Sequence, residues 1–151
     1  MMTSMAAVND FLSQRSLAVV GVSRAGKKFG NTIFTTLKER GYKVFPVNPN
    51  ADTVERERCY HSLSEVPEKV GGVVICVHPA QTEKVVHDAF EAGIERVWMQ
   101  QGAESYAALR FCEKNEMTVV HGHCILMFAE PVKSAHRLHR WVWKLIGKYP
   151  R

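Results

Sequence analysis

The sequence predicts an α/β fold in which a doubly wound parallel sheet of about five strands carries helices on both faces, giving three layers. Short apolar runs rich in valine and isoleucine alternate with stretches of helical periodicity along most of the chain. The connections are short, as in consecutive strand–helix–strand units, whose crossovers place helices on both faces of a parallel sheet. Right-handed crossovers then favour the strand order 3-2-1-4-5.

The first unit spans residues 17–50. Residues 17–22 (LAVVGV) form an apolar run typical of a buried strand, a helix follows to about Arg40, and residues 43–47 (KVFPV) predict the second strand. The prolines at 46 and 49 cannot continue a central ladder, so the second strand ends there. The inward face of the helix is expected to carry Phe29, Ile33, Phe34 and Leu37.

The later elements repeat this pattern. A short helix at 8–14 precedes the first strand, and the polar stretch 51–71 contains one helical turn at 63–66. In the helix at 81–92, Val85, Val86, Ala89 and Phe90 are expected to face inward. We expect one domain over residues 1–151. Strands are predicted at 72–77, 96–100 and 117–121, and helices at 81–92, 106–114 and, as an amphipathic C-terminal helix, about 132–146.

Composition narrows the class of protein. The net charge of +5 suits a polyanionic ligand but does not specify one. No apolar run approaches the roughly 20 residues of a membrane-spanning helix, and the first residues lack the pattern of a secretory signal. The four cysteines show no C-x-x-C spacing, which indicates reduced thiols rather than a disulfide framework. We therefore expect a cytoplasmic protein.

The turn after the first strand is the strongest functional signal. Gly21, Ser23 and Gly26 follow the spacing G-x-S-x-x-G, which is typical of turns that let a phosphate approach the backbone at a helix start. We interpret this Rossmann-like turn as the site of a phosphate-bearing cofactor. The charge to meet it would come from Arg24, Lys27 and Lys28.

Three cofactor classes compete for this turn. NAD would need an acid at the end of the second strand, but residues 47–50 (VNPN) contain none before Asp52, whereas NADP stays open. A nucleoside triphosphate would need Ser or Thr where Lys28 stands, to hold magnesium. Coenzyme A needs several positive groups near the turn and a shaped apolar slot, which the proline-bracketed strand ends could form.

The segments AVVGVSR, GYKVFPVNPN, VVICVHP, GIERVWMQQGAES and TVVHGHCI, within residues 17–126, resemble the small stand-alone CoA-binding proteins of Rossmann type. These proteins are related to the CoA-binding domain of succinyl-CoA synthetase α subunits. The resemblance implies a site for coenzyme A or acyl-CoA. Its phosphate contacts would be Gly21, Val22, Ser23, Arg24 and Lys27, with Asn48 and Pro49 beside the adenosine and Val77, His78, Gln101 and Gly102 beside the rest.

The histidines and the cysteine at the strand ends could have catalytic or metal-binding roles. His78 could act as an acid or base, and His121, His123 and Cys124 could be taken for metal ligands, but no sequence neighbour orients them. We predict non-catalytic binding of coenzyme A. The alternative is an NADP-linked oxidoreductase or a CoA-thioester enzyme that uses these histidines. A homodimer through the C-terminal helix is open, and we expect no nucleic acid partner, because basic charge alone is a weak signal.

Overall fold

The computed structural model describes residues 4–26 and 28–129 of the 151-residue chain. The predicted C-terminal helix at about 132–146 and the predicted phosphate contact Lys27 lie outside the described residues.

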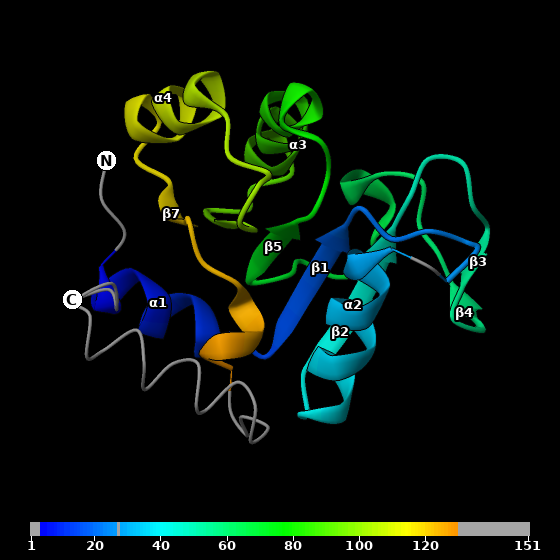
Figure 1. Ribbon diagram of the computed structural model, residues 1–151. Coiled ribbons are helices and arrows are strands. Elements are labelled where there is room, and N and C mark those ends of the chain that lie inside the picture. Colours follow the sequence, from blue (N-terminus) through cyan, green and yellow to red (C-terminus); the bar gives the residue numbers. More distant parts are fainter. Residues whose placement is uncertain (1–3, 27, 130–151) are drawn as a thin grey trace.

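A five-stranded parallel sheet forms the centre of the molecule (Figure 1). Its strands run in the spatial order β2-β1-β5-β6-β7, with Leu17 of β1 opposite Val44 of β2 on one side and Gly72 of β5 on the other. The bounds are β1 (Ser16–Val20), β2 (Lys43–Val47), β5 (Gly72–Ile75), β6 (Arg96–Met99) and β7 (Thr118–His121).

The predicted strand order 3-2-1-4-5 is wrong, because the third long strand, β5, pairs with β1 and not with β2. β2 is therefore an edge strand. Pro46 explains this position: its carbonyl faces outward and accepts a hydrogen bond from the Tyr60 backbone N–H at 3.0 Å, so its ring nitrogen also faces away from β1. A proline is tolerated on that side of an edge strand, where it removes no bond from the central ladder.

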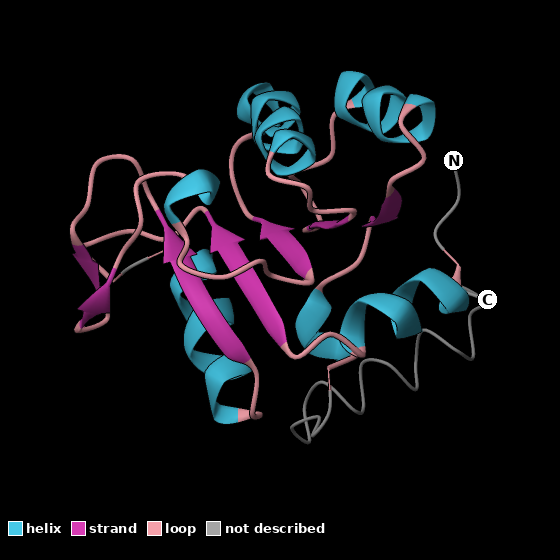
Figure 2. Ribbon diagram, turned by 180° about the vertical axis from the view of Figure 1, so that it is seen from behind, coloured by secondary structure: helices cyan, strands magenta, loops and turns pink. Residues whose placement is uncertain are grey.

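Helices cover both faces of the sheet (Figures 1 and 2). Leu17 and Val19 of β1 pack against α1 (Met5–Leu12), α2 (Phe29–Glu39) and the short 3-10 helix η2 (Ile125–Met127). Ala18 and Val20 face α3 (Pro79–Glu91) and α4 (Tyr106–Lys114). The alternation along one strand thus gives each face its own core, as the three-layer prediction required.

Helix faces were predicted less accurately than helix positions. Ile33, Phe34 and Leu37 are buried as expected, but Phe29 is 55% exposed and Phe90 is 45% exposed. Phe29 is the first residue of α2, and Phe90, one residue before the end of α3, packs against Phe111 of α4 with 5.6 Å between ring centroids.

The connection from β2 to β5 contains a small hairpin that the sequence did not indicate. Strands β3 (Thr53–Val54) and β4 (Glu57–Arg58) are antiparallel, and a 3-10 helix η1 (Leu63–Glu65) follows them. The hairpin projects from the β2 edge of the sheet in Figure 1. In the described part of the chain no helix is long and apolar enough to cross a membrane.

Candidate functional site

The carboxyl ends of the parallel strands bring the predicted site residues to one edge of the sheet. Gly21 to Arg24 follow β1, Asn48 and Pro49 follow β2, Val77 and His78 follow β5, and Gln101 and Gly102 follow β6. We call these loops, with the loop after β7, the rim. Ligands of open α/β sheets bind at such a rim, at the point where successive connections leave in opposite directions. In this sheet that point lies between β1 and β5.

The turn after β1 is packed so closely that glycine is required. Gly21 has a φ of +115°, and a Cβ built on it would lie 2.6 Å from the Cys76 carbonyl oxygen. On the other side, a Cβ on Gly30 of α2 would lie 2.4 Å from the Gly21 carbonyl oxygen. These contacts hold the start of α2 directly against the ends of β1 and β5.

Asn31 fixes the shape of this turn, a role that sequence reasoning missed. Its Oδ1 accepts a hydrogen bond from the Ser23 backbone N–H at 2.7 Å, and its Nδ2 donates to the Ser23 carbonyl at 2.7 Å. Asn31 is only 2% exposed. The one available signal was a polar amide amid the buried apolar residues of the helix. The Ser23 N–H is thus occupied by Asn31, and the Ser23 Oγ accepts from the Ala25 N–H at 3.1 Å.

Asn48 ties the second strand end to the first. Its Nδ2 donates to the Val22 carbonyl at 2.8 Å, and its Oδ1 accepts from the Asn50 N–H at 2.7 Å. Both polar atoms of the Asn48 side chain therefore bond to the backbone of the rim. Val22 is 1% exposed and belongs to the core beneath the rim. Of the predicted adenosine neighbours, Pro49 is the exposed one.

Positive charge stands at the mouth of the turn. Arg24 and Lys28 are both exposed, and Lys28 is the N-cap residue of α2 without a side-chain hydrogen bond to the helix start. The first N–H groups of a helix and the positive end of its dipole favour an anion. The turn therefore combines a helix start that its N-cap side chain does not cap with two solvent-facing cations.

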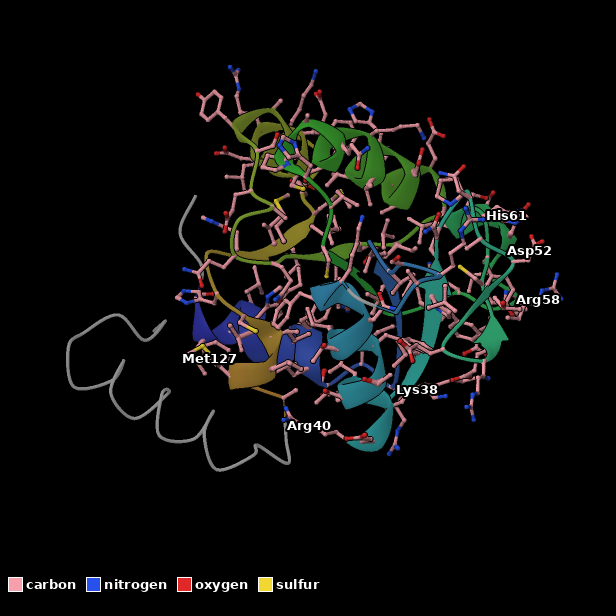
Figure 3. All side chains as sticks on the ribbon, turned by 45° about the vertical axis from the view of Figure 1, so that its right-hand side comes forward. Lys38, Arg40, Asp52, Arg58, His61 and Met127 are labelled. Carbon is pink, nitrogen blue, oxygen red and sulfur yellow. The ribbon has the colours of Figure 1, made fainter. Side chains whose placement is uncertain are left out.

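A cavity of about 240 Å³ opens beside this turn, on the α3 side of β1 and β2. Apolar side chains form most of its wall, with Pro49 and Val77 facing it from neighbouring strand ends. At its mouth, His61 Nε2 lies 2.8 Å from Asp52 Oδ1, and the two side chains are adjacent at the right of Figure 3. The full lining is Val20, Val47, Pro49, His61, Ser62, Leu63, Val77, Gln81, Lys84, Val85 and Asp88.

The model of the CoA binding domain matches residues 15–130 of this chain. The chain belongs to the CoA-binding domain family. The resemblance expected from the sequence is thereby confirmed.

Individual relatives are of two kinds. The ADP-forming acetate–CoA ligase II of Archaeoglobus fulgidus is 34% identical over 90 residues, which cover 58% of this chain and 13% of the ligase. YneT of Bacillus subtilis is 25% identical over 123 residues, covering 81% of this chain and 91% of that protein. A conserved hypothetical protein from Pyrococcus furiosus has a solved structure with a TM-score of 0.70 and 41% identity, covering 74% of this chain and 96% of that one.

Several other rim residues of this CoA-binding domain make hydrogen bonds within the protein. His78 is the N-cap of α3, where its Nδ1 accepts from the Ala80 N–H at 3.2 Å. Glu104 joins two loops, because its carboxylate accepts from the Gly102 N–H at 2.9 Å and from the Gly122 N–H at 2.8 Å. Gln101 and Gly102 are exposed at the rim.

The histidines and cysteines near β7 are partly buried. Burial lowers the pKa of His123, with a further lowering from His121 and an opposing effect of Glu104. Burial raises the pKa of the Cys76 thiol to about 12, and the neighbouring Cys124 adds to this. Among residues 4–26 and 28–129, no three His, Cys, Asp or Glu side chains gather closely enough to hold a metal ion.

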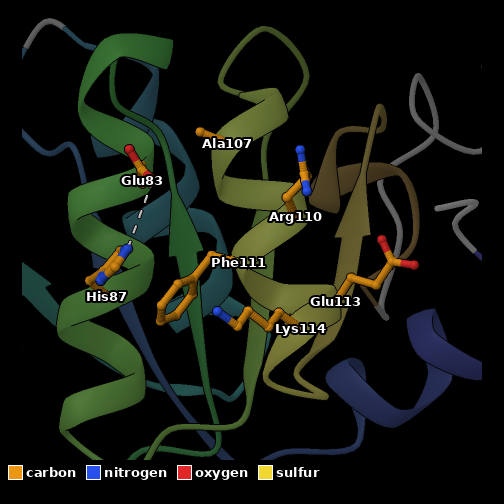
Figure 4. A pocket seen from close by; sticks show the side chains of 7 residues that line it. All are labelled: Glu83, His87, Ala107, Arg110, Phe111, Glu113 and Lys114. Atoms are coloured by element: carbon orange, nitrogen blue, oxygen red, sulfur yellow. Dashed lines mark ion pairs between the residues drawn. The ribbon is translucent and has the colours of Figure 1, made fainter.

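A second hollow of about 570 Å³ lies between α3 and α4, away from the strand ends (Figure 4). The His87 ring lies over Phe111 with 3.8 Å between centroids, and Glu83 Oε2 is 3.9 Å from His87 Nε2. Both acids and bases line this hollow, including Arg110 and Lys114. Unlike the cavity at the rim, it receives no residue from a strand end.

Proposed function

We propose that this domain binds coenzyme A or an acyl-CoA at the rim, without catalysis of its own. The observation that carries the proposal is the junction of two features in a chain of the CoA-binding domain family. A glycine turn follows β1 and leads into the start of α2, where the N-cap residue makes no side-chain hydrogen bond, and an apolar cavity lies between the ends of β1, β2 and β5.

The turn suits the phosphates of the ligand. Arg24 and Lys28 are exposed cations on either side of Gly26, where the chain has room for a bound group. A Cβ on Gly26 would contact only Glu55 Oε1, at 3.4 Å, among the described residues. We infer that Arg24 and Lys28 hold phosphate oxygens by charge-assisted hydrogen bonds. Lys27 stays a prediction from the sequence.

The cavity suits the adenine. Pro49 and Val77 present rigid and branched apolar surfaces to it, and Leu63, 6% exposed, closes its floor from η1. Planar bases bind in such slots by burying their faces against apolar side chains. Gln81 and Lys84 of α3 stand at the same wall and can donate hydrogen bonds to the edge of the base or the ribose.

Binding rather than catalysis is favoured by the extent of the relatedness. The chain matches only 12 to 19% of the length of the first three curated ligases, so the ligase reaction is not carried over. His78, the candidate acid or base, already uses Nδ1 to cap α3. From the resemblance to stand-alone CoA-binding proteins alone, we propose a role as a CoA carrier or sensor.

Isothermal titration tests the proposal. Ligand-stripped protein is titrated with CoA, dephospho-CoA, NADP and ATP. We expect the tightest binding with CoA, and about three- to tenfold weaker binding in Arg24→Ala and Lys28→Ala, since each substitution removes one exposed cation from a phosphate. Lys114→Ala, which removes a cation from the α3–α4 hollow, is the matched control and is expected to bind CoA as the wild type does. A heat of binding with NADP but none with CoA would contradict the proposal.

A further inference from the structure

The β3–β4 hairpin places a carboxylate on the glycine turn. Glu55 Oε1 lies 3.1 Å from Asn31 Nδ2, the same nitrogen that donates to the Ser23 carbonyl. The same Glu55 oxygen would lie 3.4 Å from a Cβ built on Gly26. A residue that follows β2 by eight positions thus returns to the turn after β1, beside the start of α2.

The hairpin holds Glu55 there in an unfavourable backbone conformation. Glu55 has a φ of +50° and the next residue, Arg56, a φ of +64°. Two-residue hairpin turns with positive φ at both positions are normally made by Asn-Gly or Asp-Gly. Strained residues of this kind persist where their surroundings fix them. Here the fixing contacts are the Glu55–Asn31 hydrogen bond and the ion pair between Glu57 and Lys38 of α2.

The electrostatic consequence concerns any anion that binds this turn. The start of α2 and the exposed Arg24 and Lys28 favour a negative group. The Glu55 carboxylate is itself such a group and already lies on Gly26 and Asn31. A phosphate at the same turn would be repelled by it, because like charges a few ångströms apart interact unfavourably even near solvent.

We propose that Glu55 is an internal competitor for the phosphate turn. Its carboxylate occupies the turn in the free protein and moves away when a phosphate ester or pyrophosphate group binds. The hairpin thereby lowers the affinity of the turn for a phosphate group. This inference rests on the proposed binding of CoA at the rim.

The test compares Glu55→Gln with Glu57→Gln. Gln keeps the shape of Glu55 and can still accept from Asn31, so only the charge is lost. Glu57→Gln makes the same charge change on the same hairpin, but its partner is Lys38. At low salt we expect Glu55→Gln to bind CoA about three- to tenfold more tightly than wild type, and Glu57→Gln to bind within about twofold of it. At 0.5 M NaCl the gain should shrink, because salt screens the repulsion.

Thermal unfolding gives a second readout. Without ligand, Glu55→Gln should be no more stable than wild type, since a favourable charge at a helix start is lost. With CoA it should gain more in Tm than wild type does. Equal CoA affinities in the two proteins would overturn the competitor while leaving CoA binding intact. Weaker binding by Glu55→Gln would also overturn it, since Glu55 would then be a ligand contact.

Failure of CoA to bind either protein would instead overturn the proposed function. Inorganic pyrophosphate then serves as the probe of the turn by itself. Tighter pyrophosphate binding by Glu55→Gln than by wild type would support the competitor, and equal binding would overturn it.

Discussion

The Asn31 side chain pairs with both backbone groups of Ser23, at 2.7 Å in each direction, and so closes the turn after β1 as a neighbouring strand would. The partners are eight residues apart, and one stands on the helix that the turn introduces. The amide of one side chain therefore couples the position of α2 to the shape of the turn.

Asn31→Asp keeps the shape of the side chain but should destabilise the turn. A carboxylate still accepts from the Ser23 N–H but cannot donate to the Ser23 carbonyl, and it meets the Glu55 carboxylate. We expect a loss of about 2 to 4 kcal/mol in the free energy of unfolding, measured with urea, because buried groups lose their partners. Thr32→Ala, at an exposed position of the same helix, is the control and should change stability by less than about 0.5 kcal/mol.

Gly30→Ala has two opposing effects on stability, one from helix propensity and one from packing. Alanine gains about 1 kcal/mol over glycine inside a helix, but its Cβ would lie 2.4 Å from the Gly21 carbonyl oxygen. Because that neighbour is backbone, α2 must move off β1, at a cost of about 1 to 3 kcal/mol. We expect net destabilisation in urea unfolding and weaker CoA binding. A variant more stable than wild type would show that α2 is not held against the turn.

Arg56→Gly should stabilise the protein, in contrast to Gly30→Ala. Arg56 has a φ of +64°, which costs a side-chain-bearing residue about 1 to 2 kcal/mol. Glycine relieves that strain and gives back part of it as backbone entropy, so we expect a gain of about 0.5 to 1 kcal/mol in the free energy of unfolding. Arg58→Gly lies on β4 of the same hairpin and removes the Arg58 contact with the Tyr60 ring. It should be destabilising, and equal effects of the two substitutions would argue against backbone strain.

The pH dependence of stability should report His123. Burial lowers the pKa of its imidazole in the folded protein, so the unfolded chain takes up a proton at higher pH than the folded one does. The free energy of unfolding therefore falls as pH drops through about 6.5. His123→Gln does not titrate, so between pH 7.5 and 5.5 it should lose less stability in urea than wild type. Equal losses would show that His123 is not the group responsible.

Sequence periodicity was sufficient to predict the layers but not the strand order. The bounds of β2 and of α4 are as predicted, since their apolar runs end at clear breakers. The order 3-2-1-4-5 is wrong, and the crossover from β2 to β5 carries no α-helix that would help to place β5. Pro46 carried the missing information, since a proline within a strand indicates an edge.

Some of the candidate site residues could be placed at the rim from the sequence. Gly21, Pro49 and Val77 could be placed at the rim because each follows an apolar run. Asn31 and Glu55 could not, because their roles depend on contacts across 8 and 24 residues of sequence. The hairpin that carries Glu55 was missed because its strands have two residues each and its turn lacks glycine and asparagine.

The central claim is that coenzyme A binds at the rim, and an amide NMR titration of the whole chain with CoA tests it most directly. The account predicts that the largest shift changes fall on Arg24, Asn48, Val77 and Gln101, around the glycine turn and the 240 Å³ cavity. The amide of Phe111, in the hollow between α3 and α4, should stay in place. Shift changes centred on that hollow, or none at all at saturating CoA, would contradict the account.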